Sequence, residues 1–240
     1  MDVLVKIARV PAHNPWLQRE AQTLQRFIDE RFLQPLGKTV AGLHDSFLLA
    51  DGTKRFAVTV LRHRPALVSL EQVLRAHPKG LEPDDALWIC RRVIAQPLAA
   101  LMAGLVHGAL VPPHLLVDPI KREPVVLGWP HARPTGERIT HLIPSYKAYY
   151  PPEILHRQPA DHRSDIYMAG KCMIALNGGD VHRNTLPKTL AEPVRRLILA
   201  CVAMEPKKRP QNAKVFLTDF TAAVRKAYGQ TYRPLIVSAT

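Results

Sequence analysis

Histidine is the residue type in this sequence with the widest choice of chemistry, because a neutral imidazole can bind a metal ion or carry a proton near pH 7. The chain holds 11 histidines among its 240 residues. None of them belongs to a His-Glu-x-x-His motif or to a pair spaced by four residues beside a third ligand, the spacing that places two imidazoles on one helix face. We therefore expect no metal site and no cofactor.

The three cysteines, Cys90, Cys172 and Cys201, are too few and too widely spaced for a disulfide framework or a zinc site with thiolate ligands. We interpret Cys172 and Cys201, which lie on apolar helix faces, as core residues. No run of 18 apolar residues occurs, and no basic leader precedes an apolar stretch, so the sequence predicts neither a membrane span nor secretion. Together these features predict a reducing, cytoplasmic location.

Lysine and arginine outnumber aspartate and glutamate by 33 to 20, which gives a formal net charge of +13. This excess attracts anionic partners but says nothing about the fold. Basic residues gather in four groups, at 91–92, 121–122, 195–196 and 207–209. Such groups can bind an acidic protein or a nucleic acid, but only 6% of the residues are aromatic and no nucleic-acid-binding motif occurs. We expect a protein partner, an acidic one being an option, and keep nucleic acid as a less favoured alternative.

Apolar residues make up 47% of the chain and charged residues 22%, a composition typical of a folded globular protein. Alternating and β-rich apolar runs predict strands at 3–8, 46–50, 56–61 and 124–127, with a hairpin turn at 51–53. Apolar residues at helical spacing predict helices at 16–32, 69–76, 83–105, 164–176, 190–204 and 213–228. The sequence therefore predicts an α+β fold with most strands near the N-terminus and a mainly helical C-terminal part.

Six short motifs follow one another in the order found in eukaryotic-like protein kinases. They are Val-Leu-Val-Lys, a helical Arg-Glu-Ala, His-Gly-Ala-Leu, Pro-Pro-Glu, Ser-Asp-Ile-Tyr and Lys-Lys-Arg-Pro. The chain resembles this family over residues 3–226, in a degenerate form of bacterial type. The resemblance implies a bilobal kinase-like fold, with a reduced N-terminal lobe at 1–64 that lacks the Gly-rich loop and a helical C-terminal lobe at 65–240.

The resemblance implies a vestigial nucleotide site in the N-terminal part. Lys6 matches the strand lysine that holds nucleotide phosphates, and Glu20 matches the helix glutamate that pairs with it. Leu116 falls where a residue lines the floor of the adenine site. Leu4 stands where a small alanine is expected, so its side chain should project into the adenine space and weaken nucleotide binding.

Three positions that carry catalysis in the family hold other residues here. Ala109 stands at the position of the catalytic aspartate, His114 at that of the metal-binding asparagine, and Gly128 in the region of the metal-binding aspartate. Gly108 replaces an arginine that pairs with phosphate in the family. Because a methyl group cannot accept a proton and Mg²⁺ prefers oxygen ligands, these replacements predict no catalytic residues and no kinase activity.

The residues that hold the family's architecture together are retained. The resemblance implies a buried ion pair between Glu153 and Arg209, and it implies that Asp165 caps the backbone of the loop around residue 108. His107 and Trp129 match residues of a packed internal spine. The combined pattern is that of a pseudokinase.

We therefore expect a catalytically inactive kinase-like domain that acts as a protein-interaction or scaffold module. Two alternatives stay open. The first is a nucleotide-binding switch or an atypical transferase with residual activity, and the second is a basic nucleic-acid-binding protein. No feature of the sequence indicates an oligomeric state.

Overall fold

The computed structural model describes residues 2–64, 66–119 and 124–229, and these residues form both helices and strands. The strands are β1 (Val3–Ile7), β2 (Leu43–Asp51), β3 (Lys54–Arg62), β4 (Val68–Ser69), β5 (Leu105–Val106), β6 (Leu115–Val117), β7 (Pro124–Val126) and β8 (Arg133–Pro134). The α-helices are α1 (Asn14–Asp29), α2 (Leu70–Ala76), α3 (Pro83–Val93), α4 (Gln96–Met102), α5 (Pro152–Leu155), α6 (His162–Leu176), α7 (Glu192–Cys201) and α8 (Ala213–Tyr228). The predicted α+β class is confirmed for this part of the chain. The basic pair at 121–122 lies outside the described residues.

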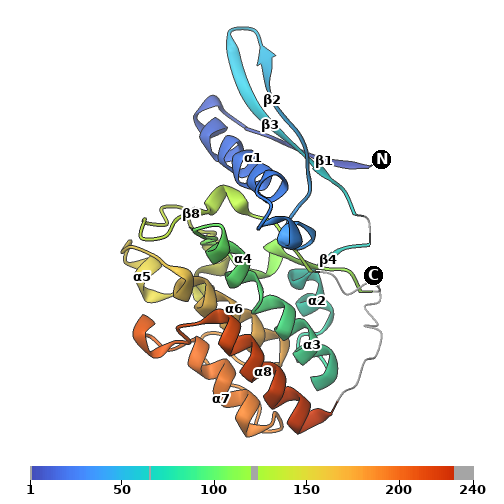
Figure 1. Ribbon diagram of the computed structural model, residues 1–240, viewed down its shortest axis with the longest axis vertical. Coiled ribbons are helices and arrows are strands. Elements are labelled where there is room, and N and C mark those ends of the chain that lie inside the picture. The colour runs from blue at the N-terminus through green and yellow to red at the C-terminus, as the bar shows by residue number, and fades with distance from the viewer. Residues whose placement is uncertain (1, 65, 120–123, 230–240) are drawn as a thin grey trace.

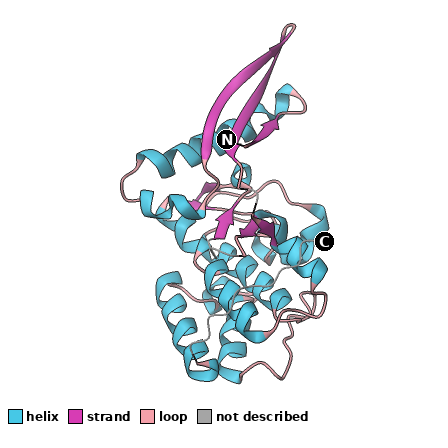
Figure 2. Cartoon of the chain, turned by 90° about the vertical axis from the view of Figure 1, so that its right-hand side faces the viewer, coloured by secondary structure: helices cyan, strands magenta, loops and turns pink. Residues whose placement is uncertain are grey.

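The first three strands form an antiparallel sheet in the order β1-β3-β2. A turn with Gly52 in the left-handed region, at φ +56°, joins β2 to β3. Helix α1 packs on one face of this sheet, where the Thr59 hydroxyl of β3 donates to the Leu17 carbonyl at 3.2 Å. Figures 1 and 2 show the β2–β3 hairpin projecting away from the helices. Two smaller sheets, β4-β6-β7 and β5-β8, lie between this sheet and the helices.

The helical part is built around α6, nearly all of whose side chains are buried. Helices α3, α4 and α7 pack against it, so apolar side chains are needed on every side of α6 rather than along one stripe. Within the described part of the chain, no helix is both long enough and apolar enough to cross a membrane. The division into a lobe at 1–64 and a lobe at 65–240 stays a prediction, and residue 65 itself lies outside the described residues.

The single helix predicted at 83–105 is wrong. Helix α3 ends at Val93 and α4 begins at Gln96. Pro97 has no backbone N–H, so it cannot donate to the carbonyl four residues earlier, at Val93, and the helix breaks between them. The apolar spacing continues across the break because α3 and α4 both pack against α6.

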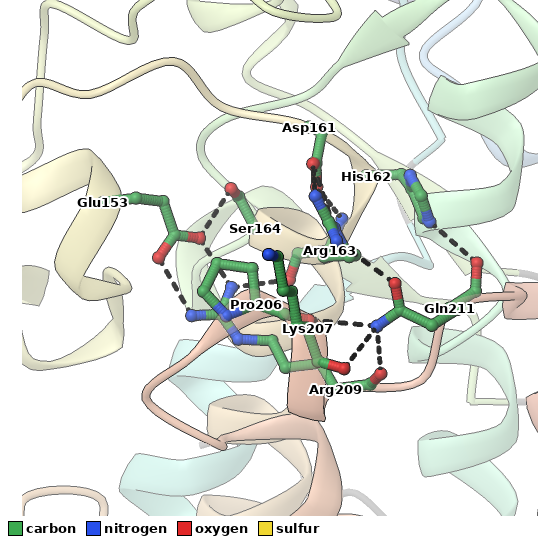
Figure 3. Close-up of polar contacts among 9 residues, drawn as sticks. All are labelled: Glu153, Asp161, His162, Arg163, Ser164, Pro206, Lys207, Arg209 and Gln211. Atoms are coloured by element: carbon green, nitrogen blue, oxygen red, sulfur yellow. Dashed lines mark hydrogen bonds and ion pairs between the residues drawn. The ribbon is translucent and has the colours of Figure 1, made fainter.

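A buried ion pair fastens the segment around α5 to the helical body (Figure 3). Arg209 Nη1 lies 2.5 Å from one carboxylate oxygen of Glu153, and Nη2 lies 2.9 Å from the other. Both side chains are almost fully buried, at 0% and 8% exposure. Burial raises the pKa of Glu153, but the hydrogen bonds from Arg209 outweigh burial and leave the pKa below its ordinary value. Glu153 is therefore charged in the folded protein near neutral pH.

Arg209 makes more contacts than this ion pair alone. Its guanidinium also donates to the carbonyls of Ala203, Met204 and Arg163, and it lies over the Tyr167 ring at 4.8 Å. Glu153 accepts one further hydrogen bond, from the Ser164 hydroxyl at 2.8 Å. Removal of the arginine therefore leaves a buried carboxylate and three carbonyl groups without their donor. Removal of the glutamate leaves one buried cation that keeps its carbonyl partners.

We predict that Arg209→Ala lowers the free energy of unfolding by about 3–5 kcal/mol, because it leaves a buried carboxylate unpaired. Glu153→Ala should cost less, and the double variant should cost less than the sum of the two, because both changes remove one shared interaction. Urea unfolding of the four proteins measures this cycle. Strictly additive costs would show that the two side chains are not coupled.

Candidate functional site

Lys6 and Glu20, the two residues expected at a nucleotide site, meet between β1 and α1. The Lys6 Nζ atom lies 2.7 Å and 3.0 Å from the two carboxylate oxygens of Glu20. Glu20 is fully buried, whereas 28% of the Lys6 side chain is exposed. A buried carboxylate thus holds an ammonium group that solvent can still reach, an arrangement that can receive an anionic group of a ligand.

A cavity of about 190 Å³ lies on the same face of β1 as Lys6. Leu4 and Leu116, both expected to line a nucleotide site, form part of its wall, together with Leu61, Leu127 and residues 62–64. Leu4 therefore lines the cavity, where we had expected it to fill the adenine space. The cavity is smaller than the roughly 300–1,000 Å³ of most small-molecule sites, so a ligand of ordinary size would have to extend out of it.

The carboxylate of Asp165 fixes the loop that follows β5. It accepts the backbone N–H of His107 at 2.7 Å and that of Gly108 at 2.9 Å, and it is completely buried. Burial raises the pKa of Asp165 to about 7, against the lowering effect of the two amide donors. The side chain expected to cap this loop is thus in contact with it.

Of the three degenerate positions, His114 lies against both Ala109 and Gly128. The Ala109 carbonyl accepts a hydrogen bond from His114 Nδ1 at 2.8 Å, and a Cβ added at Gly128 would lie 2.3 Å from that nitrogen. None of the three supplies a carboxylate. Among the described residues, no three His, Cys, Asp or Glu side chains gather to hold a metal ion. The site therefore offers imidazole nitrogens and backbone groups where oxygen ligands for Mg²⁺ would be needed.

His107 and Trp129 pack together beneath α1. Their ring centroids lie 4.7 Å apart, and Trp129 also contacts the Phe27 ring of α1 at 5.2 Å. His107 Nε2 lies 2.9 Å from the Leu127 carbonyl, which can only accept, so Nε2 carries the hydrogen. His107 Nδ1 is then free to accept the Ala109 N–H, at 3.2 Å. Burial, with repulsion from neighbouring histidines, lowers the pKa of His107 well below its ordinary value.

Sequence reasoning missed a group of cationic side chains beside this site. Arg19 of α1 and Arg133 of β8 both donate to the Pro130 carbonyl, at 3.3 Å and 3.1 Å. His131 and His141 lie in the same region, where His131 Nδ1 donates to the His141 carbonyl at 3.3 Å. Sequence reasoning did not find this group because Arg19 drew attention only as the neighbour of Glu20, and His131, Arg133 and His141 follow more than a hundred residues later, outside any motif.

Comparison with known proteins shows a distant similarity to a bacterial protein. No protein-family model matches the chain. The chain is 27% identical over 167 residues to serine/threonine-protein kinase Pkn3 of Myxococcus xanthus. The match covers 55% of this chain and 30% of that protein, so the chain spans less than a third of its relative's length. The protein is thus distantly similar to a bacterial serine/threonine kinase, in agreement with the family that the motifs resemble.

This finding corrects one of our expectations. We predicted that the chain is not an enzyme, because Ala109, His114 and Gly128 replace catalytic residues. The similarity contradicts that prediction, since the relative is a serine/threonine-protein kinase and points toward a kinase.

His114 makes the site sensitive to pH. Its Nδ1 carries the hydrogen donated to the Ala109 carbonyl, and burial, with repulsion from His131 and Lys6, lowers its pKa to about 4. The unfolded chain binds this proton near pH 6.5. Between pH 6.5 and 4 the unfolded state therefore binds more protons than the folded state. The contribution of His114 to the free energy of unfolding is complete above pH 6.5 and is lost as the pH falls toward 4.

We predict that His114→Asn reduces the acid sensitivity of the fold. Asparagine can still donate to the Ala109 carbonyl but does not titrate. Between pH 7 and 4.5 the wild type should lose about 2 kcal/mol more unfolding free energy than the variant. Urea titrations at both pH values give the two differences. Equal losses in the two proteins would show that His114 is not held neutral by the fold.

Proposed function

We propose that this chain is a protein-kinase-like domain that acts as a protein-interaction module. The observation that carries the proposal is an apolar face on the β1-β3-β2 sheet. Lys6 and Thr59 point toward α1 on one side of the sheet, so their neighbours in each strand point to the opposite side. We call this opposite side the outer apolar face, and it consists of Val3, Val5, Ile7, Phe47, Leu49, Phe56, Val58 and Val60.

The outer apolar face is exposed on both edge strands. Val5 and Ile7 of β1 are 50% and 52% exposed, and Phe47 of β2 is 46% exposed. Contiguous apolar surface of this kind is uncommon on a soluble monomer unless it binds a partner. Within the described residues, β1 and β2 each pair with β3 alone, so each also has one edge open to a further strand. These features favour a partner that brings an apolar surface or a strand to the sheet.

We predict that Val5→Ser combined with Phe47→Ser weakens partner binding by at least tenfold, because the two changes remove exposed apolar side chains from both edge strands of the outer apolar face. The matched control is Val215→Ser in α8, which changes an equally exposed apolar residue elsewhere on the molecule. A partner should co-purify from the organism of origin with the wild type and with the control, and be lost with the double variant. Direct titration of the purified pair gives the affinities. Equal affinity for all three proteins, each checked for an unchanged melting temperature, would contradict the proposal.

A second candidate function is nucleotide-dependent phosphoryl transfer. The contact between Lys6 and Glu20 supports it, together with the cavity lined by Leu4 two residues before Lys6, as does the similarity to a serine/threonine kinase. Because Ala109, His114 and Gly128 supply no carboxylate, the proton acceptor and the metal ligands would have to come from other groups.

This candidate predicts that ATP with Mg²⁺ raises the melting temperature, because a ligand that binds only the folded state stabilises it. Labelled γ-phosphate should be transferred to the protein itself or to a generic substrate. Lys6→Met should abolish both effects, while Lys214→Met, which removes an exposed lysine from α8, should leave them intact. Absence of transfer and of any melting shift in the wild type would exclude this candidate without affecting the interaction proposal.

A further inference from the structure

One of the four basic groups in the sequence, at 91–92, borders a cavity between helices α3 and α8. The two helices lie side by side in the helical part (Figure 1). The cavity measures about 320 Å³, so it reaches the size of most small-molecule sites, roughly 300–1,000 Å³. It is larger than the cavity beside Leu4 and shares no lining residue with it. A small organic molecule therefore has room at a place that the proposed function does not use.

The wall of this cavity combines apolar and cationic side chains. It is formed by Trp88, Arg91, Arg92 and Ala95 from α3 and the turn after it, and by Leu217 and Thr221 from α8. None of the described lining residues is acidic, so the wall itself carries only positive charge. The cavity thus fits a molecule that has both an apolar part and a negative charge.

Arg91 brings a positive charge without a partner to the cavity. Its side chain is half-buried, and among the described residues it forms no hydrogen bond, ion pair or ring contact. Withdrawing a charge from water is costly unless an opposite charge or hydrogen bonds replace the lost hydration. A guanidinium binds a carboxylate through two parallel hydrogen bonds from its planar fork. An anionic ligand would therefore supply the partner that the described part of the chain does not provide.

The position of Arg92 is set by the neighbouring indole ring. The guanidinium carbon of Arg92 lies 5.2 Å from the centroid of the Trp88 ring, which is within the range of a cation–π interaction. Trp88 is itself almost fully buried, so it offers Arg92 a fixed surface. The second arginine therefore stays beside the cavity and adds to the positive charge that a ligand meets there.

One hydroxyl group of α8 is available to the same ligand. The Thr218 hydroxyl donates its hydrogen to the Lys214 carbonyl at 3.1 Å. Thr221, one turn further along the helix, makes no such bond among the described residues, so its hydroxyl hydrogen is free to be donated. A carboxylate in the cavity can accept it, since a carboxylate oxygen accepts more than one hydrogen bond.

We propose that the cavity between α3 and α8 binds a small organic carboxylate with an apolar body. Arg91 pairs with the carboxylate, Thr221 donates to it, and the apolar body lies against Trp88 and Leu217. A bare inorganic anion would leave the apolar wall uncovered, and a neutral apolar molecule would leave Arg91 unpaired. The cavity lies apart from the outer apolar face, so a failure of binding here would leave the proposed function unaffected.

Calorimetric titration of the full chain tests the ligand class. Sodium phenylacetate and sodium hexanoate carry a carboxylate on an apolar body, whereas phenylacetamide lacks the charge and sodium acetate lacks the body. At an ionic strength fixed with sodium chloride, the first two should bind about tenfold or more tightly than the last two, because only they use both parts of the wall. They should also raise the melting temperature, since they bind the folded state. Equal affinity for phenylacetate and phenylacetamide, or no binding of either apolar carboxylate, would overturn the proposal.

Arg91→Gln should weaken phenylacetate binding about tenfold or more, because it removes charge-assisted hydrogen bonds. It should leave the melting temperature unchanged, since Arg91 has no partner among the described residues. The matched control is Arg225→Gln, which removes the same charge from an exposed position of α8 outside the cavity wall. Equal affinity of these two variants for phenylacetate would contradict the proposal.

Ala95→Phe separates binding in the cavity from attraction by surface charge. The added ring occupies the cavity while every charged residue stays in place, so phenylacetate binding should be lost. Undiminished binding by a variant that unfolds at the wild-type temperature would show that the ligand lies elsewhere, and would overturn the proposal. If Ala95→Phe does not fold, the comparison of Arg91→Gln with Arg225→Gln decides the outcome.

Discussion

The candidate site depends above all on the carboxylate of Asp165. A buried carboxylate is costly unless hydrogen bonds satisfy it, and Asp165 finds two donors in the backbone N–H groups of His107 and Gly108. The loop can present both groups only because Gly108 adopts φ +72°, and a Cβ there would also lie 2.6 Å from the Ile139 side chain. The central helix α6 therefore sets the shape of the loop, independently of any ligand.

A series of side-chain contacts connects this loop to α1 and to the sheet that contains β1. His107, held by its own backbone, packs against Trp129, and Trp129 packs against Phe27 of α1. Helix α1 in turn carries Glu20, which holds Lys6 of β1. An unbroken series of contacts thus joins the helical body to the exposed lysine, so a change in the packing around Trp129 would also move the ion pair.

Sequence reasoning identified the residues that lie in ordered motifs and missed those whose proximity depends on the fold alone. Lys6, Glu20 and Asp165 could be named in advance because each lies in a short motif, and these motifs follow one another in the order found in protein kinases. Arg19 and Arg133 could not, because only the packing of α1 against the segment after β7 brings them together. The break between α3 and α4 was missed because apolar periodicity outweighed the effect of one proline. The outer apolar face was also missed, since its residues alternate with inward-facing ones and emerge only from the strand register.

The packing of His114 against Gly128 shows why positions 109, 114 and 128 cannot be considered one at a time. Gly128 has φ +87°, and any side chain there would begin 2.3 Å from His114 Nδ1. That nitrogen is itself fixed by its hydrogen bond to the Ala109 carbonyl. A carboxylate at position 128 would therefore require a smaller residue at 114. That smaller residue would also have to donate a hydrogen bond, because otherwise the Ala109 carbonyl would lose its donor. Asparagine at 114 meets both conditions, so the loop can accommodate oxygen ligands only through coupled changes at these positions.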